Sequence, residues 1–256
     1  MRKFGFFSAF VLIFFIYSAT GFAYSESQLP EYQLLFSLDV GYAYNKDMND
    51  DVDDYTLYAE DDLNTYYSPS SYSHKVETTK ANLPVGFNIE FRSFWDNIGF
   101  GVQVGYHMVK AESKLGGSYP DHDKATSTYE LTVVPIVATL YYRVDFESSN
   151  SFVLVGGGLG YYFGNLSVEL ERQDDLLGIW NKRSFDGSQS KIGAHILVEY
   201  DYVFDFGLTL FAGLKARYVQ FDEFKDGIYY LKNNSGSKFK AGLTGVSLYL
   251  GAGASF

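Results

Sequence analysis

The segment Leu83-Pro84-Val85-Gly86-Phe87-Asn88-Ile89-Glu90-Phe91-Arg92 alternates between two kinds of side chain. Its odd positions are bulky and apolar, and its even positions are small or polar. Successive side chains of a strand point to opposite faces, so the segment predicts a strand with one apolar and one polar face. The charges share their face with glycine. This arrangement is typical of a barrel whose outside meets lipid.

The same two-residue pattern returns along the chain. We therefore predict an all-β fold, a transmembrane up-and-down antiparallel β-barrel of eight strands. The predicted strands cover residues 32–44, 79–92, 98–109, 131–143, 152–164, 191–202, 207–219 and 243–256. Their apolar faces contain no charge. This matters because a Lys or Arg facing the middle of a bilayer costs about 2–4 kcal/mol.

The connections between these strands alternate in length. Residues 93–97, 144–151 and 203–206 form short connections, and residues 45–78, 110–130, 165–190 and 220–242 form long ones. Short periplasmic turns and long extracellular loops are the expected asymmetry of such a barrel. A ten-stranded barrel stays open as an alternative, because residues 54–60 and 166–170 are also strand-like.

The N-terminus has the residue pattern of an export signal. Arg2 and Lys3 precede an apolar run over residues 4–17, and the small residues Gly21 and Ala23 follow. This order predicts a signal peptide at residues 1–23 and a barrel domain at residues 24–256, with an uncleaved membrane anchor as the alternative. The chain has no cysteine, so neither a disulfide nor a lipidated cysteine is expected.

The composition agrees with a membrane barrel. The chain holds 23 Tyr, 23 Phe and 25 Gly, which suits aromatic girdles and close strand packing. Its net charge of −11 argues against nucleic-acid binding, which needs a basic surface. No later segment reaches about 18 consecutive apolar residues, so we expect no transmembrane helix.

The last strand carries a family resemblance. Leu248-Tyr249-Leu250-Gly251-Ala252-Gly253-Ala254-Ser255-Phe256 ends the chain on an aromatic residue. With the signal peptide and the strand pattern, the chain resembles the small OmpA-like, OmpX-like or "porin family" outer-membrane barrels. The resemblance implies location in the outer membrane of a Gram-negative bacterium, among lipid and lipopolysaccharide. It also implies that the barrel-assembly machinery reads an assembly signal at Tyr249 and Phe256. It says little about activity, because this fold hosts many functions.

Charged residues also occupy the inward positions. This predicted lumen charge network consists of Asp39, Glu90, Arg92, Arg143, Lys191, Glu199, Asp201, Lys215 and Arg217, and Gln103, His107 and His195 share its face. An eight-stranded barrel is just wide enough for side chains to fill it, and buried charges must pair. Asp39 is expected to meet Lys215 or Arg217, and Glu90 to meet Arg92 or Arg143. The network is either a polar plug or the gate of a narrow pore.

The first long connection is rich in acid and tyrosine. Asn49, Asp51, Asp53 and Glu60 match positions 1, 3, 5 and 12 of a calcium-binding loop. Position 1 is Asn in place of Asp, and Asp54 stands where the turn needs Gly. Loose divalent-cation bridging to lipopolysaccharide and contact with a protein ligand through tyrosines are the other interpretations.

These observations predict a surface protein whose loops contact lipopolysaccharide, host or partner molecules. A narrow porin-like channel for small solutes is the alternative, and a lipid-modifying enzyme or protease is a third. The enzyme interpretation has little support. Asp121-His122-Asp123 is a local acid–histidine group without a matching second pair. We therefore expect no catalytic residue and no cofactor.

Overall fold

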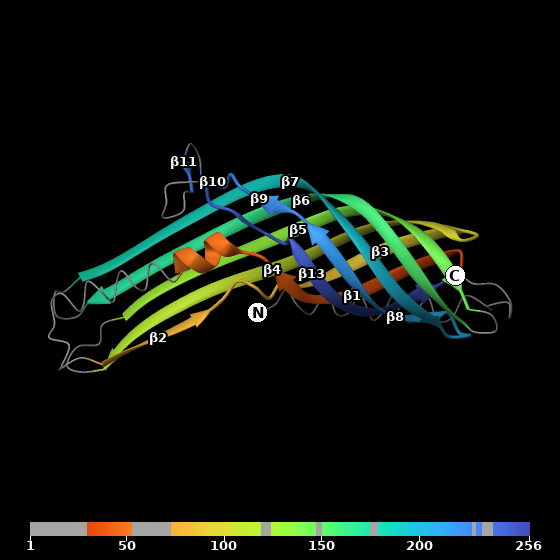
Figure 1. The fold of residues 1–256 in the computed structure, drawn as a ribbon, viewed down its shortest axis with the longest axis horizontal. Helices are drawn as coiled ribbons and strands as arrows, with labels where there is room; N and C mark the ends of the chain where they lie inside the picture. Colours follow the sequence, from red (N-terminus) through yellow and green to blue (C-terminus); the bar gives the residue numbers. More distant parts are fainter. Residues whose placement is uncertain are drawn as a thin grey trace, which may run out of the picture.

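The computed structural model describes residues 30–52, 73–118, 124–146, 150–174, 179–226, 229–231 and 238–256. The predicted signal peptide at residues 1–23 lies outside these ranges. The described residues form an elongated barrel with tilted strands (Figure 1). Within them, no helix is both long and apolar enough to cross a bilayer.

Eight strands pair edge to edge and close into a ring, which confirms the predicted antiparallel barrel. The pairing of β1 with β13 joins the first and last strands of the ring. Around the ring the order is β1 (Tyr32–Ala43), β3 (Val85–Trp95), β4 (Ile98–Ser118), β5 (Lys124–Asp145), β6 (Ser151–Asp174), β7 (Ile179–Val203), β8 (Leu208–Tyr218) and β13 (Gly245–Ser255). Strands adjacent in the ring follow one another along the chain, so the topology is up-and-down.

The short connections lie at one end of the barrel, which we call the turn end (Figure 1). Asp96 begins the turn between β3 and β4 with a φ of 51°. Gly207 ends the connection between β7 and β8 with a φ of 83°, a conformation that glycine adopts without steric cost. The backbones of Tyr32 and Phe256 exchange hydrogen bonds of 2.9 and 3.0 Å, which fixes the C-terminus at this end.

At the opposite end, the loop end, four strands continue well past the others. The prediction of loops at 110–130 and 165–190 is therefore wrong. β4 continues to Ser118, β5 begins at Lys124, β6 runs to Asp174 and β7 begins at Ile179. The alternation continues there with polar residues on the outside, as in Lys110, Glu112 and Lys114, while Val109 and Ala111 stay buried.

We call this extension the raised sheet: residues 110–118 of β4, 124–132 of β5, 165–174 of β6 and 179–190 of β7. The strand-like residues 166–170 belong to β6, so they add no strand to the ring. The second strand-like segment, 54–60, lies outside the described ranges. β3 begins at Val85, later than predicted, and β2 (Ser73–Thr79) is a separate strand that pairs with β4.

Short elements surround the loop end. They are a helical segment at residues 46–52, β9 (Gln220–Phe221), β10 (Lys225–Asp226), β11 (Tyr229–Tyr230) and β12 (Ala241–Gly242). β9 pairs with β12, and β10 joins β7 through Lys225 and Ser188. These elements place side chains over the loop end of the barrel interior.

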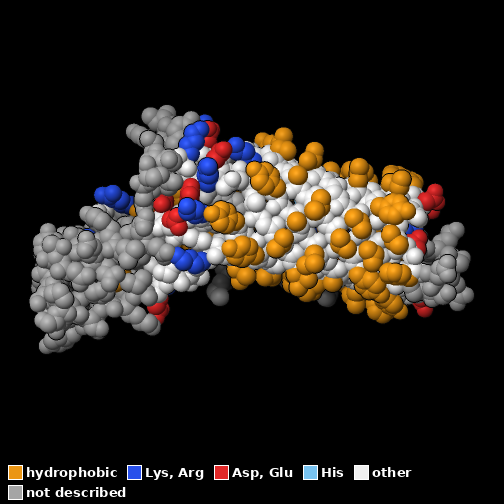
Figure 2. All heavy atoms as spheres, viewed as in Figure 1, with side chains coloured by type: hydrophobic (Ala, Val, Ile, Leu, Met, Phe, Trp, Pro, Cys, Tyr) orange, Lys and Arg blue, Asp and Glu red, His pale blue; other side chains and the backbone are white. Residues whose placement is uncertain are grey.

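The outside of the barrel carries an apolar belt (Figure 2). Exposed members include Leu38, Val40, Phe87, Phe91, Val102, Val104, Ile136, Leu140, Leu159, Ile196, Val198, Leu210, Leu214, Leu248 and Leu250. Aromatic pairs border the belt at the turn end: the rings of Tyr32 and Phe256 lie 6.1 Å apart, and those of Phe204 and Phe206 lie 5.4 Å apart. An apolar outside flanked by aromatic residues is the surface that a bilayer requires.

Candidate functional site

The inward faces of the eight strands hold the candidate site. Because inward and outward residues alternate, each charge on an inward position is removed from the lipid and turned toward the barrel axis. Eight of the nine predicted network residues are buried: Asp39, Glu90, Arg92, Arg143, Glu199, Asp201, Lys215 and Arg217. They fall into two groups along the axis, with Arg143 beyond them at the turn end.

The turn-side group is built around Arg92. The Nη2 atom of Arg92 donates to Glu199 Oε2 and to Glu90 Oε2, each at 3.0 Å. Its Nη1 atom lies 3.6 Å from Asp201 Oδ2. The hydroxyl of Tyr141 donates to Glu90. Arg92 belongs to β3 and Glu199 to β7, on opposite walls of the ring, so their contact crosses the lumen.

Glycine makes room for this group. A Cβ atom on Gly101 would lie 2.5 Å from Glu90 Oε1 and 2.8 Å from Tyr141 Cε2. Gly101 on β4 therefore lets the Glu90 carboxylate and the Tyr141 ring share the centre of the barrel. Such close approach is a common reason for glycine within a strand.

The loop-side group is built around Arg217 and Lys215 of β8. Arg217 pairs with Asp39 of β1. Lys215 Nζ donates to Gln103 Oε1 at 3.0 Å and lies 4.9 Å from the centre of the Tyr249 ring. Gln103 lies on β4, opposite β8 in the ring, so this is a second contact across the lumen. His107 Nε2 and Asn88 Oδ1 lie 3.0 Å apart beside it.

Two network residues lie apart from these groups. Arg143 pairs with Asp145 at 3.0 Å near the turn end and stacks over Phe94 and Phe152, so Glu90 meets Arg92 and not Arg143. Lys191 lies at the loop end, 2.8 Å from Asp222 Oδ1, with 35% of its side chain exposed. Lys191 occupies an inward-facing position of β7, but it lies at the rim of the barrel. The alternation of side chains does not show how deep in the lumen a residue lies.

The predicted assembly residues also separate. Tyr249 turns inward and is buried against Phe211, with ring centres 6.3 Å apart. Phe256 follows β13 and is 41% exposed at the turn end. Only Phe256 is therefore displayed on the outer surface of the barrel.

The predicted cation loop is only partly described. Asn49 lies in the helical segment 46–52, where its Oδ1 accepts the backbone N–H of Ala81 at 2.6 Å and its Nδ2 donates to Asn82 at 2.8 Å. Asp51 is buried, and Asp53 and Glu60 lie outside the described ranges. In the described part of the chain, no three His, Asp or Glu side chains are placed to hold a metal ion.

An apolar plug closes the loop end of the lumen. Its members include Met48, Val52, Ala81, Val109, Ala111, Tyr129, Leu131, Leu166, Val168, Phe221, Phe224, Phe239 and Leu243, all buried. Phe239 packs on Tyr129 and Phe224, with ring centres 5.8 and 6.5 Å apart. A second cluster, which includes Phe94, Phe152 and Val203, lies toward the turn end. The charged groups are thus enclosed between two apolar layers.

Sequence reasoning underestimated the neutral partners. The alternation predicts only that Gln103, His107 and His195 point inward, and the resemblance assigns Tyr249 to the assembly signal. In the structure these side chains contact the charges or the cavity beside them. Alternation reveals which residues face inward. It does not reveal which of them meet, because contacts across a barrel depend on strand stagger.

Beyond the belt, ion pairs cover the raised sheet. Glu112 lies 3.1 Å from Lys114 Nζ and 3.6 Å from Lys110 Nζ. Partial burial opposes ionisation of Glu112, but these lysines outweigh it and hold its pKa below the usual value. The hydrogen bond from Lys191 likewise lowers the pKa of Asp222. The raised sheet therefore meets water with ionised side chains.

The closed ring and the apolar belt define the chain as a transmembrane β-barrel, and the described side chains fill its lumen. No known protein family and no curated protein matches the chain. Several solved structures are similar to it, and three of them are described below.

Neisserial surface protein A shares 14% identity, with a TM-score of 0.31, over 87% of this chain and 97% of its own. Ail, the attachment invasion locus protein of Yersinia pestis, solved in complex with the heparin analogue sucrose octasulfate, shares 14% identity, with a TM-score of 0.30, over 88% of this chain and 99% of its own. The translocator domain of the autotransporter NalP from Neisseria meningitidis shares 9% identity, with a TM-score of 0.34, over 88% of each chain.

Proposed function

We propose that the chain is an outer-membrane surface protein of a Gram-negative bacterium, in which a closed barrel anchors a contact surface at the loop end. One observation carries this proposal: the lumen is filled by side chains, whereas four strands continue past the belt as the raised sheet. A barrel built to conduct needs an open interior. A barrel built to display needs a rigid support for what lies above the membrane.

The outward face of the raised sheet suits contact with polar molecules. Its charged side chains include Lys110, Lys114, Lys124, Lys182, Glu112, Glu130, Glu169 and Glu171. Lys110 stands opposite Glu130, and Thr126 and Thr128 of β5 stand opposite Glu171 and Glu169 of β6. Lysines just beyond the belt suit the phosphates of lipopolysaccharide, and mixed charge with hydroxyls suits a protein partner.

The raised sheet also offers a free edge. In the described part of the chain, β7 pairs with β8 only from Ala194 onward and with β10 at Ser188. Residues 179–187 of β7 therefore turn one row of backbone N–H and C=O groups away from β6. An exposed strand edge is a template for an added strand of a partner.

The same proposal covers assembly and chemistry. Phe256, exposed at the turn end, would serve as the signal for the barrel-assembly machinery. We assign no catalytic role to the chain. His107 and His195 are enclosed in the lumen, where a substrate outside the barrel does not reach them.

Cysteine labelling tests the placement, because the chain has no cysteine of its own. Ser184→Cys on the raised sheet should react with a membrane-impermeant maleimide on intact cells. Asp205→Cys at the turn end should react only after the outer membrane is opened. The reverse pattern would contradict the proposed orientation.

Trimming the sheet tests the function. A variant that joins Leu166 of β6 to Gly187 of β7 through a short turn keeps the membrane-spanning pairing intact. Cells carrying it should lose binding to immobilised lipopolysaccharide or to fixed host cells, relative to cells carrying the full chain. Equal binding by both, with both barrels folded, would remove the β6 and β7 part of the raised sheet from the function.

A further inference from the structure

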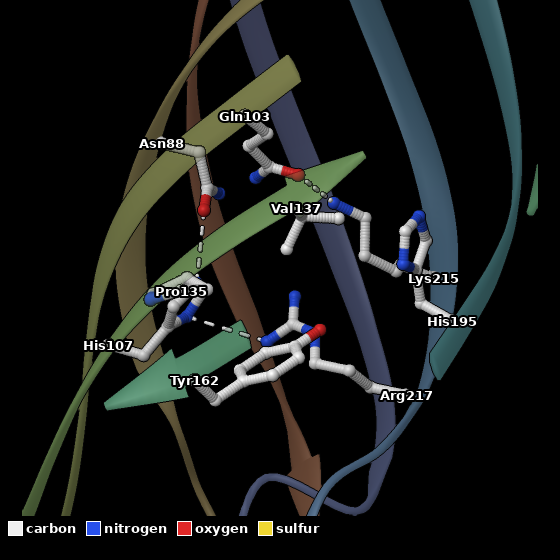
Figure 3. Close-up of a pocket in the computed structure, with 9 residues that line it drawn as sticks. All are labelled: Asn88, Gln103, His107, Pro135, Val137, Tyr162, His195, Lys215 and Arg217. Carbon is white, nitrogen blue, oxygen red and sulfur yellow. Dashed lines mark hydrogen bonds between the residues drawn. The ribbon is translucent and has the colours of Figure 1, made fainter. Parts of the chain in front are cut away.

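A small cavity interrupts the packed lumen on its loop side (Figure 3). Its volume is about 10 Å³, enough for the centre of roughly one water-sized occupant. Its lining includes Lys215 and Arg217 of β8, His195 of β7, and Gln103 and His107 of β4. No carboxylate belongs to the lining, although carboxylates are numerous elsewhere in the lumen.

Only one of the two cations of this cavity contacts a carboxylate among the described residues. Arg217 pairs with Asp39. Among the described residues, no carboxylate oxygen lies within 4.0 Å of Lys215 Nζ, whose contacts are the neutral Gln103 amide and the face of Tyr249. Lys215 is only 5% exposed. A buried ammonium without an adjacent counter-charge is costly, so the site favours an added negative charge.

A second, independent group points to the same occupant. His195 is 4% exposed and lines the cavity. Its Nε2 atom lies 3.0 Å from Thr139 Oγ1, whereas its Nδ1 atom has no hydrogen-bond partner in the described structure. When the Thr139 hydroxyl donates to Nε2, Nδ1 carries the ring proton and is a free donor. In that tautomer, the lining supplies an ammonium, a guanidinium and an N–H group.

We propose that this cavity is a binding site for one small monovalent anion of halide size, held by Lys215 and His195 beside Arg217. The described carboxylates of the turn-side group contact Arg92 and do not line this cavity, so they act on Lys215 only from beyond contact distance. The ion would join the two halves of the lumen by giving Lys215 a direct counter-charge. It is a structural ion, because the apolar plug separates it from the loop end.

Thermal unfolding of the barrel, purified from membranes in detergent, tests the proposal. Chloride is titrated against gluconate, which is too large for the cavity, at constant ionic strength. The unfolding midpoint should rise with saturation, by about 4 °C at ten times the dissociation constant. Lys215→Met should abolish the rise. Lys191→Met, which removes a rim lysine of the same charge, should keep it. Equal rises in the wild type and Lys215→Met would overturn the site.

Crystals grown in bromide give a readout that needs no variant. An anomalous peak between Lys215 Nζ and His195 Nδ1 is expected. If Lys215→Met fails to fold, this peak decides the matter alone. A cavity without anomalous signal at saturating bromide shows that no halide binds there and that the proposal is wrong.

Discussion

Arg92 and Glu199 lie on opposite walls of the barrel and meet at its axis, with Arg92 Nη2 and Glu199 Oε2 3.0 Å apart. Both residues are 1% exposed. Strands β3 and β7 are far apart around the ring, so this contact ties walls that no backbone hydrogen bond joins. It also places charge where an open pore would need water.

Removing Arg92 should therefore be severe. Arg92→Met leaves Glu199 and Asp201 buried without their cation, and breaking a buried pair from one side costs about 3–5 kcal/mol. Urea unfolding followed by heat-modifiable gel migration measures the loss. Lys182→Met is the matched control, because its partner Glu169 is 3.8 Å away and both side chains are about half exposed. A loss below about 1 kcal/mol would mean that the turn-side group does not stabilise the barrel.

An added charge on the outer surface of a strand should be tolerated beyond the belt but not within it. Leu210 is 44% exposed on the lipid-facing side of β8, so Leu210→Arg should cost about 2–4 kcal/mol or prevent insertion. Ser190→Arg, just beyond the belt on β7, should cost about 0–1 kcal/mol. The fraction of folded barrel in membranes, read from gel migration, gives both values. Normal folding of Leu210→Arg would refute the assignment of faces.

The filled lumen predicts electrical silence. The folded chain in a planar bilayer should show no steady single-channel openings, because Arg92, Lys215 and the apolar plug occupy the axis. Openings whose size changes in Lys215→Ala or Arg217→Ala would instead support the porin-like alternative. Heat-modifiability must first show that the tested barrel is folded.

The rim pair of Lys191 and Asp222 should depend on pH. The hydrogen bond from Lys191 lowers the pKa of Asp222, despite partial burial that opposes the shift. The pair is therefore intact above the ordinary Asp value near 3.8 and is lost as the pH falls through the lowered value. Carboxyl NMR titration should show the Asp222 midpoint moving up in Lys191→Met and staying unchanged in Lys182→Met. An unmoved midpoint in Lys191→Met would exclude the pair in solution.

Much of the fold is visible in the sequence, for a physical reason. Lipid outside and side chains inside force a two-residue alternation, so Leu83 to Arg92 reveals both faces of a strand. The same rule fails past the membrane edge. At Lys110 the outward residue becomes charged, which resembles the start of a loop, although Val109 and Ala111 continue the buried face. The end of a strand cannot be inferred from the sequence where the inward face stays apolar but the outward face changes from apolar to charged.

The site is less visible than the fold. Inward alternation predicts that Glu90 and Arg217 face the lumen, and both are buried in the structure, but it does not separate Lys191 at the rim from Lys215 at the centre. The depth of a residue along the barrel axis depends on strand tilt and on the stagger between strands. Neither can be inferred from the sequence of one strand. The plug was missed for a related reason: Phe221, Phe224 and Phe239 come from a segment without long strands.

The raised sheet has one more consequence. β4, β5, β6 and β7 rise beyond the belt, whereas β1, β3, β8 and β13 end near its edge. The described strands are therefore asymmetric about the membrane normal, because they extend past the belt on one side of the barrel only. A neighbouring protein in the same membrane meets either the side with the extended strands or the side where the strands end near the belt, depending on how the barrel is rotated. A lateral contact with another membrane protein therefore requires a particular rotation of the barrel about the membrane normal.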